Sequence, residues 1–159
     1  MKSAYLFIPA LIIFLSGCSQ KDNTSLINTA ASLPESFNFN QMGLKVINSS
    51  TNPKKETMST LYGNDQALAA YKGNGGTQPG EVIALVTWKQ QEDDHWFGAK
   101  IPGKLLALEL IKTKAGQPAN HPEIVYQRFE GSKLTLNNDT AGRSKSIAYI
   151  LSQQPSILP

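Results

Sequence analysis

Apolar and polar residues alternate over short stretches along most of this chain, which is the pattern of half-buried β-strands. Residues 81–88, EVIALVTW, differ because both alternating sets are mostly apolar. A strand with two apolar faces is covered on both sides, so we expect it near the centre of a sheet. A loop containing Asn52-Pro53 separates the first two stretches and predicts a hairpin. Five of the predicted strands can be given bounds, namely 43–48, 57–62, 81–88, 105–111 and 123–129.

Two stretches carry the signals of short helices. Asn64 is a typical N-cap for the first helix, and Gly73 ends it. Asn138 or Thr140 opens the second helix, and Pro155 ends it. The apolar face of the second helix comprises Ile147, Ile150 and Leu151. The predicted order β-β-α-β-β-β-β-α gives one α+β domain with a mainly antiparallel sheet and two short flanking helices.

The first residues resemble the signal of a bacterial lipoprotein. Lys2 precedes an apolar run of about twelve residues, which is too short to span a bilayer because a span needs roughly 20. The following Leu15-Ser16-Gly17-Cys18 resembles the lipobox at which lipoproteins are cleaved and lipidated. We therefore expect a signal peptide over 1–17, lipid such as palmitate on Cys18, a flexible tether over 18–40, and one domain over 41–159. Phe37 and Phe39 are the residues of the tether that could begin the fold.

This signal also predicts a location. Several acyl chains, at about 0.8 kcal/mol per buried CH₂, hold a protein at a membrane. Ser19 follows the cysteine, where an inner-membrane retention signal usually shows Asp. We therefore expect a protein of the cell envelope, anchored by lipid to the outer membrane on its periplasmic face. The membrane is then one partner, reached through the N-terminal lipid.

Charge and cysteine content exclude several classes of function. The formal net charge is +3 and the only charge in residues 1–17 is Lys2, so the processed chain carries +2. The basic residues are scattered, whereas a nucleic-acid-binding protein concentrates them on one face, so no nucleic-acid partner is expected. Cys18 is the only cysteine, which leaves no disulfide, thiolate zinc site or cysteine nucleophile once it is lipidated.

The segment around 88–100 is the strongest candidate for a binding surface, because it combines aromatic and polar side chains as a pocket rim does. An equal alternative is a plain hairpin with a solvated acidic tip and aromatic anchors. Asp93 and His95 could share a metal with His121, but two histidines without ligand spacing predict no metal site. The candidate surface comprises Trp88, Gln91, Glu92, His95, Trp96, Phe97 and Lys100. No Gly-x-Ser-x-Gly or phosphate-loop motif is present, so no catalytic residue is predicted.

Three segments together resemble the cytochrome P-460 family, which includes the cytochrome c-prime-beta proteins. They are Thr60-Leu61-Tyr62-Gly63-Asn64, Pro79-Gly80-Glu81-Val82 leading into the strand that ends at Trp88, and the segment from Gly98 to Gly103. The similarity runs from about Gly43 to the C-terminus. It implies an antiparallel sheet with flanking helices, which agrees with the pattern of apolar residues.

One feature of that family is missing from this sequence. Members with covalent haem carry a Cys-x-x-Cys-His motif near the C-terminus, but Ser144 to Pro159 contains neither cysteine nor histidine. A covalent c-type haem is therefore excluded, and the family's haem and catalytic residues cannot be carried over.

Three functions follow as hypotheses. The first is a lipid-anchored binding domain facing the periplasm, without covalent haem, that takes a small molecule or an envelope protein. The second is an oxidoreductase or gas-binding protein that holds haem non-covalently, with His95 or His121 as the axial ligand. The third is a structural envelope lipoprotein.

Overall fold

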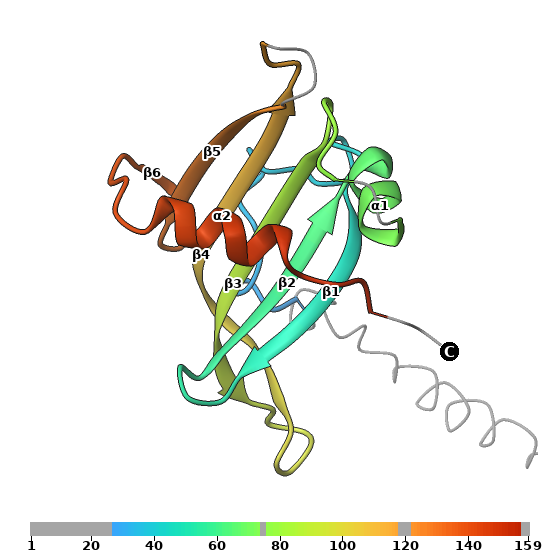
Figure 1. The fold of residues 1–159 in the computed structure, drawn as a ribbon. Helices are drawn as coiled ribbons and strands as arrows, with labels where there is room; N and C mark the ends of the chain where they lie inside the picture. The colour runs from blue at the N-terminus through green and yellow to red at the C-terminus, as the bar shows by residue number, and fades with distance from the viewer. Residues whose placement is uncertain (1–26, 74–75, 118–121, 157–159) are drawn as a thin grey trace, which may run out of the picture.

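A computed structural model describes residues 27–73, 76–117 and 122–156 (Figure 1). Within them the chain forms six strands and two helices in the order β-β-α-β-β-β-β-α. The prediction of an α+β domain with a mainly antiparallel sheet and two helices is confirmed. The strands are β1 Lys45–Asn52, β2 Thr57–Gly63, β3 Val82–Glu92, β4 Lys100–Lys114, β5 Glu123–Glu130 and β6 Thr135–Asn137. The helices are α1 Asp65–Lys72 and α2 Arg143–Leu151.

The strands lie side by side in the same order as along the chain, and each neighbouring pair is antiparallel. β3 is interior and buries side chains on both of its faces, as its two apolar sets predict. β1 is irregular between Val46 and Asn48, so that Ile47 turns toward the face on which the helices lie. No helix in the described part of the chain has the length and apolarity needed to cross a membrane.

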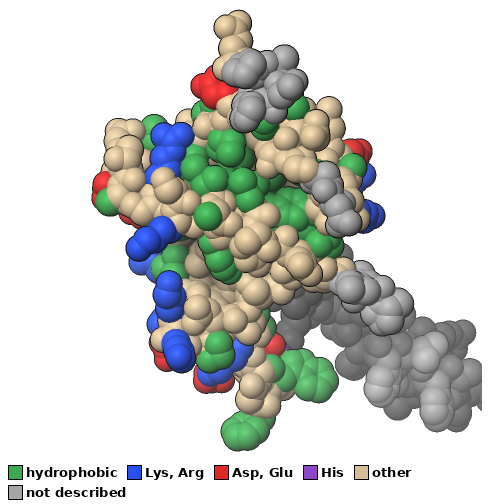
Figure 2. Space-filling model, in the orientation of Figure 1, with side chains coloured by type: hydrophobic (Ala, Val, Ile, Leu, Met, Phe, Trp, Pro, Cys, Tyr) green, Lys and Arg blue, Asp and Glu red, His purple; other side chains and the backbone are tan. Residues whose placement is uncertain are grey.

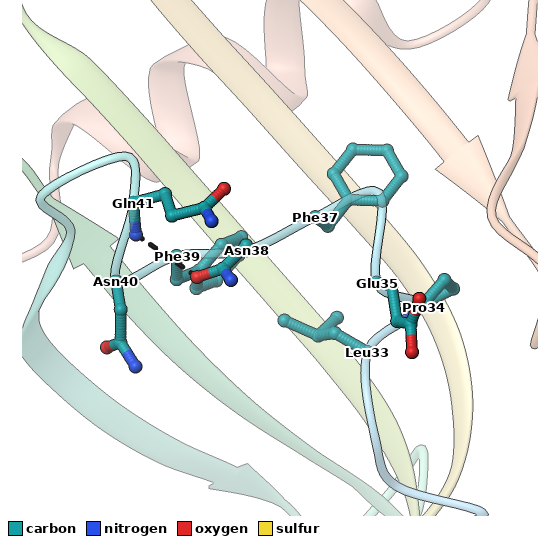
Figure 3. Close-up of a pocket in the computed structure, with 8 residues that line it drawn as sticks. All are labelled: Leu33, Pro34, Glu35, Phe37, Asn38, Phe39, Asn40 and Gln41. Carbon is teal, nitrogen blue, oxygen red and sulfur yellow. Dashed lines mark hydrogen bonds between the residues drawn. The ribbon is translucent and has the colours of Figure 1, made fainter.

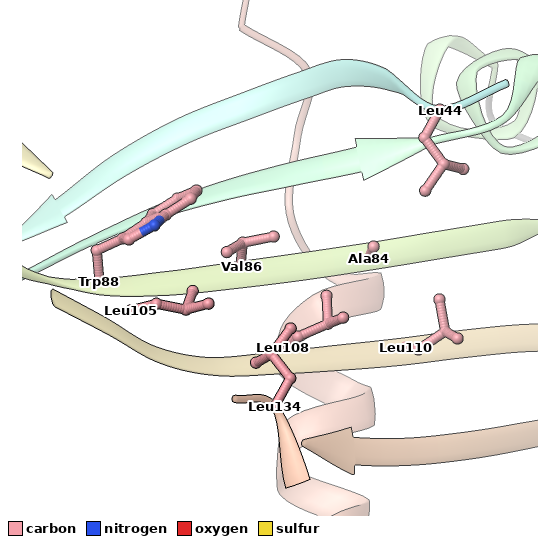
Figure 4. Close-up of a cluster of buried hydrophobic side chains, with 8 residues drawn as sticks. All are labelled: Leu44, Ala84, Val86, Trp88, Leu105, Leu108, Leu110 and Leu134. Atoms are coloured by element: carbon pink, nitrogen blue, oxygen red, sulfur yellow. The ribbon is translucent and has the colours of Figure 1, made fainter. Parts of the chain in front are cut away.

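One face of the sheet carries a core cluster that includes Trp88 at one end and Leu110 toward the other (Figure 4). The indole N–H of Trp88 donates a 2.8 Å hydrogen bond to the Ala31 carbonyl. The cluster comprises Leu44, Ala84, Val86, Trp88, Leu105, Leu108, Leu110 and Leu134. Burying such side chains stabilises a fold by roughly 1.5–3 kcal/mol each.

The N-terminal segment covers this cluster, so the fold begins earlier than the expected domain boundary at residue 41, and it includes Phe37 and Phe39. Phe37 packs edge-to-face on Phe129 with ring centroids 4.9 Å apart, and Phe39 packs on Tyr62 at 4.8 Å. Ala31, Leu33 and Met42 also contact the cluster. The described part of the expected tether is therefore packed on the sheet, because its scattered apolar side chains cover a face that would otherwise be open to water.

The two helices lie on the other face, where α2 runs across the sheet (Figure 1). Ile150 of α2 is fully buried against Ile83 and Ile111 in the second cluster. The Tyr71 hydroxyl at the end of α1 donates a 2.8 Å hydrogen bond to the carbonyl of Ile150. This bond joins the two helices over one half of the sheet.

The predicted start of α1 is confirmed and that of α2 is wrong. The Asn64 side chain accepts a hydrogen bond from the Ala67 N–H at 3.0 Å, as an N-cap does. α2 begins after Gly142, because the Asn137 and Asp139 side chains accept bonds from backbone N–H groups two residues on. Such local bonds favour turns over helix. α2 also ends at Leu151, four residues before Pro155.

Candidate functional site

On the face crossed by α2, the strands change from apolar to polar along their length. In β2 the inward side chain changes from buried Leu61 to Ser59, and in β3 from Leu85 to Thr87. In β4 the same side changes to a carboxylate at Glu109. α2 covers the apolar half, so the polar half remains open as a groove beside the helix.

The groove has a volume of about 520 Å³, within the range of small-molecule sites. Strands β1 to β5 form its floor and one wall, and α2 forms another wall. Hydroxyl groups make up much of its surface. It is lined by Ser50, Thr51, Asn52, Lys55, Thr57, Ser59, Leu85, Thr87, Leu106, Ala107, Glu109, Arg128, Lys145, Ser146 and Tyr149.

Side chains on the groove floor are held in place by hydrogen bonds. The hydroxyls of Ser59 and Thr87 lie 3.1 Å apart across β2 and β3. Glu109 is only 8% exposed, and its Oε1 accepts a 2.5 Å hydrogen bond from the Tyr126 hydroxyl. Burial, and then this bond to Glu109, raise the pKa of the Tyr126 phenol above its usual 10.0. Tyr126 therefore stays protonated near neutral pH and donates to the carboxylate.

The charges of the groove are mainly positive. Three cationic side chains, Lys55, Arg128 and Lys145, face one carboxylate, Glu109. Arg128 is shared, because its Nη1 lies 3.5 Å from Glu109 and its Nε donates a 2.7 Å bond to Glu130. The two lysines are the cations that stand outside this network.

A second hollow, of about 580 Å³, lies along residues 33–41 (Figure 3). A single stretch of chain lines it, and its polar groups are mostly amides. The Asn38 side chain accepts a 3.1 Å bond from the Gln41 N–H, which closes a local turn. Glu35 is the one charged residue along it. This hollow follows from the path of the covering segment, and it offers less chemistry than the groove.

The structure separates the residues of the predicted binding surface. Trp88 is 7% exposed in the core, whereas His95, Trp96 and Phe97 are exposed in the loop between β3 and β4. Trp96 and Phe97 therefore do not anchor the hairpin, and that interpretation is wrong. They project because the loop extends past the end of the sheet. None of these four lines the groove.

Three other predicted residues lie at the base of this loop. Glu92 and Lys100 face each other as an ion pair that closes the hairpin. Gln91 lies beside the backbone of Gly103. Cys18 and His121 lie outside the described residues. Within those residues, no group of three or more His, Cys, Asp and Glu side chains is placed to hold a metal ion.

Sequence reasoning missed the groove, although one signal for it exists. Glu109 interrupts the apolar run Leu105 to Ile111, and Thr87 similarly interrupts the run of β3. A carboxylate in a buried strand needs partners, so it marks a polar site. The other residues that line the groove come from other strands and from α2, and the strand register that brings them together is not visible in the sequence.

Comparison with known proteins supports the fold. Residues 38–146 match the family described as Cytochrome P460, which covers more than half of the chain. The match begins in the segment that covers the first cluster and ends in α2. No curated protein matches this chain.

Proposed function

Because the chain belongs to the cytochrome P460 family, we propose that it is a lipid-anchored binding domain that uses the family's fold without covalently attached haem. The ligand is a small, polar, negatively charged molecule held in the groove beside α2. The observation that carries this proposal is the lining of the groove, in which hydroxyl groups surround an excess of cationic side chains.

The family is haem-binding, so the groove residues have to be tested against haem. Haem iron in proteins is held by His, Cys, Met or Tyr. Among the described residues that line the groove, Tyr149 alone is of these types, and no histidine, cysteine or methionine is present. The macrocycle also needs apolar walls, whereas three of the fifteen lining side chains are aliphatic. The residues present therefore do not fit haem, and a polar ligand suits them better.

The same residues give the ligand its chemistry. A carboxylate or phosphate oxygen accepts hydrogen bonds from Lys145 and from the Thr87 hydroxyl, which is free to donate when the Ser59 hydroxyl donates to Thr87, and bonds of this charge-assisted kind are the stronger ones. Burial of part of the ligand against Leu85 and Ala107 adds apolar contact. Specificity then depends on matching the hydroxyl groups, because unpaired polar groups on either side weaken binding.

The location is proposed from the sequence around Cys18. The lipobox-like Leu-Ser-Gly-Cys supports lipidation at this residue, and Ser19 supports an outer-membrane anchor that faces the periplasm. Mass spectrometry of protein purified from its native envelope tests this. Acyl groups on Cys18 support the anchor, and an unmodified, unprocessed chain contradicts it.

Two matched substitutions test the groove. Thr87→Val removes a hydroxyl from the groove, and Thr60→Val removes one from the opposite face, where Ser49 lies 3.1 Å from it. Both changes preserve side-chain shape and break a cross-strand hydroxyl contact of the same length. NMR chemical shifts measured with a panel of small carboxylates and phosphates report binding, with the corresponding neutral amides and alcohols as controls.

We expect shift changes to cluster on the groove residues and to need the anionic group. Thr87→Val and Lys145→Gln should each weaken binding about tenfold, which corresponds to the loss of one hydrogen bond to a charged group. Thr60→Val should leave it unchanged. Equal losses from Thr87→Val and Thr60→Val, or shifts that map elsewhere, contradict the site.

Haem titration tests the alternative. The proposal predicts that the protein shows no Soret absorption band after haemin is added. A Soret band abolished by Tyr149→Phe, by His95→Ala or by His121→Ala favours a haem protein instead.

A further inference from the structure

The loop between β3 and β4 presents two adjacent aromatic side chains to water. Trp96 is 72% exposed and Phe97 is 111% exposed. Green side chains project at the end of the molecule where Figure 1 places this hairpin, well clear of the rest of the surface (Figure 2). Burying such side chains is favourable by roughly 1.5–3 kcal/mol each, so their exposure marks a contact site.

Hydrogen bonds within the loop fix its conformation, so Trp96 and Phe97 are held in an exposed position. The Asp93 carboxylate accepts a 2.8 Å hydrogen bond from the His95 N–H. The Asp93 N–H in turn donates to the Ala99 carbonyl at 3.1 Å. Gly98, with φ of 77°, supplies the left-handed turn after Phe97. A loop closed in this way loses little conformational freedom on docking.

The N-terminal segment meets the sheet at this same end. The Asn28 side-chain amide donates a 2.7 Å hydrogen bond to the Pro102 carbonyl, and the Leu105 N–H donates to the Ala30 carbonyl at 3.0 Å. Pro102 is only five residues from Phe97. Cys18 is ten residues before Asn28, a span of at most about 35 Å in fully extended chain. Lipid on Cys18 therefore holds the aromatic end of the domain within reach of the bilayer.

We infer that Trp96 and Phe97 form a second membrane contact, inserted into the lipid surface to which Cys18 is anchored. This inference rests on the proposed lipid anchor. Trp is enriched at the membrane interface, because its ring is apolar and its N–H remains hydrated. Glu92 is paired with Lys100, but Asp93 and Asp94 beside the aromatic pair oppose anionic headgroups, so the contact is with uncharged or zwitterionic lipid.

Tryptophan fluorescence on vesicles tests the inference, because Trp96 and Trp88 are the only two tryptophans and Trp88 is buried. Lipidated protein from the envelope is placed on phosphatidylcholine vesicles with or without bromine on the acyl chains. We expect Trp96 emission to move to shorter wavelength and to be quenched by the brominated lipid. Trp96→Phe, which leaves Trp88, should abolish both changes.

Variants at exposed apolar positions serve as matched controls. Phe97→Ala should reduce the quenching of Trp96, whereas Leu136→Ala, also exposed but on β6, should not. Both positions are solvent-exposed, so both variants should fold. Adding anionic lipid should not increase quenching.

A second arm separates this inference from the proposed anchor. Cys18 is the only cysteine, and the chain from Cys18 onward contains every residue of the described fold. Coupling it to vesicles that carry a maleimide headgroup therefore places the domain at a bilayer even where native lipidation fails. Quenching in this arm supports the loop contact independently of the native anchor. Unquenched, unshifted Trp96 emission from vesicle-bound protein overturns the loop contact.

Discussion

The indole N–H of Trp88 donates a 2.8 Å hydrogen bond to the carbonyl of Ala31, and so joins the central strand β3 to the segment that covers its face. The two residues lie 57 positions apart in the chain. Trp88 thus has a structural role on the face opposite the groove, and its contact with Ala31 holds the covering segment against β3.

Trp88→Phe tests this role. The substitution keeps an aromatic ring but leaves the Ala31 carbonyl without its donor, so the free energy of unfolding should fall by about 1–3 kcal/mol. Urea unfolding measures the change. Trp96→Phe in the exposed loop is the control and should change stability by less than about 0.5 kcal/mol. Equal effects of the two variants would show that the hydrogen bond to Ala31 contributes little.

Gly63→Ala should destabilise the junction between β2 and α1. An added Cβ would lie 2.7 Å from Ile47 Cδ1 and 2.9 Å from Ala67 Cβ, which is closer than carbon atoms pack. We expect a loss of about 1–3 kcal/mol by overpacking. Gly76→Ala, where an added Cβ meets no atom within 4 Å, is the matched control. Thermal unfolding of the two variants compares them, and a Gly63→Ala protein as stable as the control contradicts the close packing.

Stability should depend on pH through Glu81. This carboxyl is 2% exposed, and burial raises its pKa above the usual 4.5, although the 2.6 Å bond from the Gln78 N–H acts in the opposite direction. Between 4.5 and the raised value the folded chain keeps a proton that the unfolded chain releases. The free energy of unfolding therefore falls as pH rises through this window.

Glu81→Gln keeps an oxygen acceptor for Gln78 and removes the titrating group. Its stability should lack this decline, which urea unfolding from about pH 4 to about pH 7 measures for both proteins. Glu123→Gln at an exposed position is the control and should retain the decline. If the free energy of unfolding depends on pH in the wild-type protein as it does in Glu81→Gln, the Glu81 carboxyl is not desolvated.

Ile150→Ala should loosen α2 from the sheet. Its side chain is fully buried in the second cluster, so truncation should cost about 2–5 kcal/mol. Because Ile150 holds α2 on the sheet, the substitution should increase amide hydrogen exchange more in α2 than in β3. Leu136→Ala, at an exposed position, should leave both the stability and the exchange of α2 unchanged. Protection of α2 that survives Ile150→Ala would contradict this anchoring role.

The elements that could be predicted are those with local signals. The two apolar sets of 81–88 predict an interior strand, and Asn64 predicts the start of α1, because alternation and capping act over a few residues. The start of α2 was predicted too early, because Asn137 and Asp139 use the same polar side chains to form turns. Composition alone does not separate these two uses.

The rest depends on contacts between distant residues. Phe37 and Phe39 could be expected to begin the fold, but their partners Phe129 and Tyr62 are distant in sequence, so this packing is not visible before the sheet exists. The groove needs Thr87 and Glu109 to share a face with α2, which strand register decides. The exposure of Trp96 and Phe97 follows from the length by which β3 and β4 extend past their neighbours.

The order of the strands has a consequence for how the chain acquires its shape. From β2 onward, every strand pairs with the strand before it, so the sheet itself needs no pairing between strands distant in sequence, although the covering segment and the helices pack on distant residues. Such a sheet can grow one strand at a time from its first hairpin, in the direction from the N-terminus to the C-terminus. The last helix then covers one face of the sheet, after all six strands have formed.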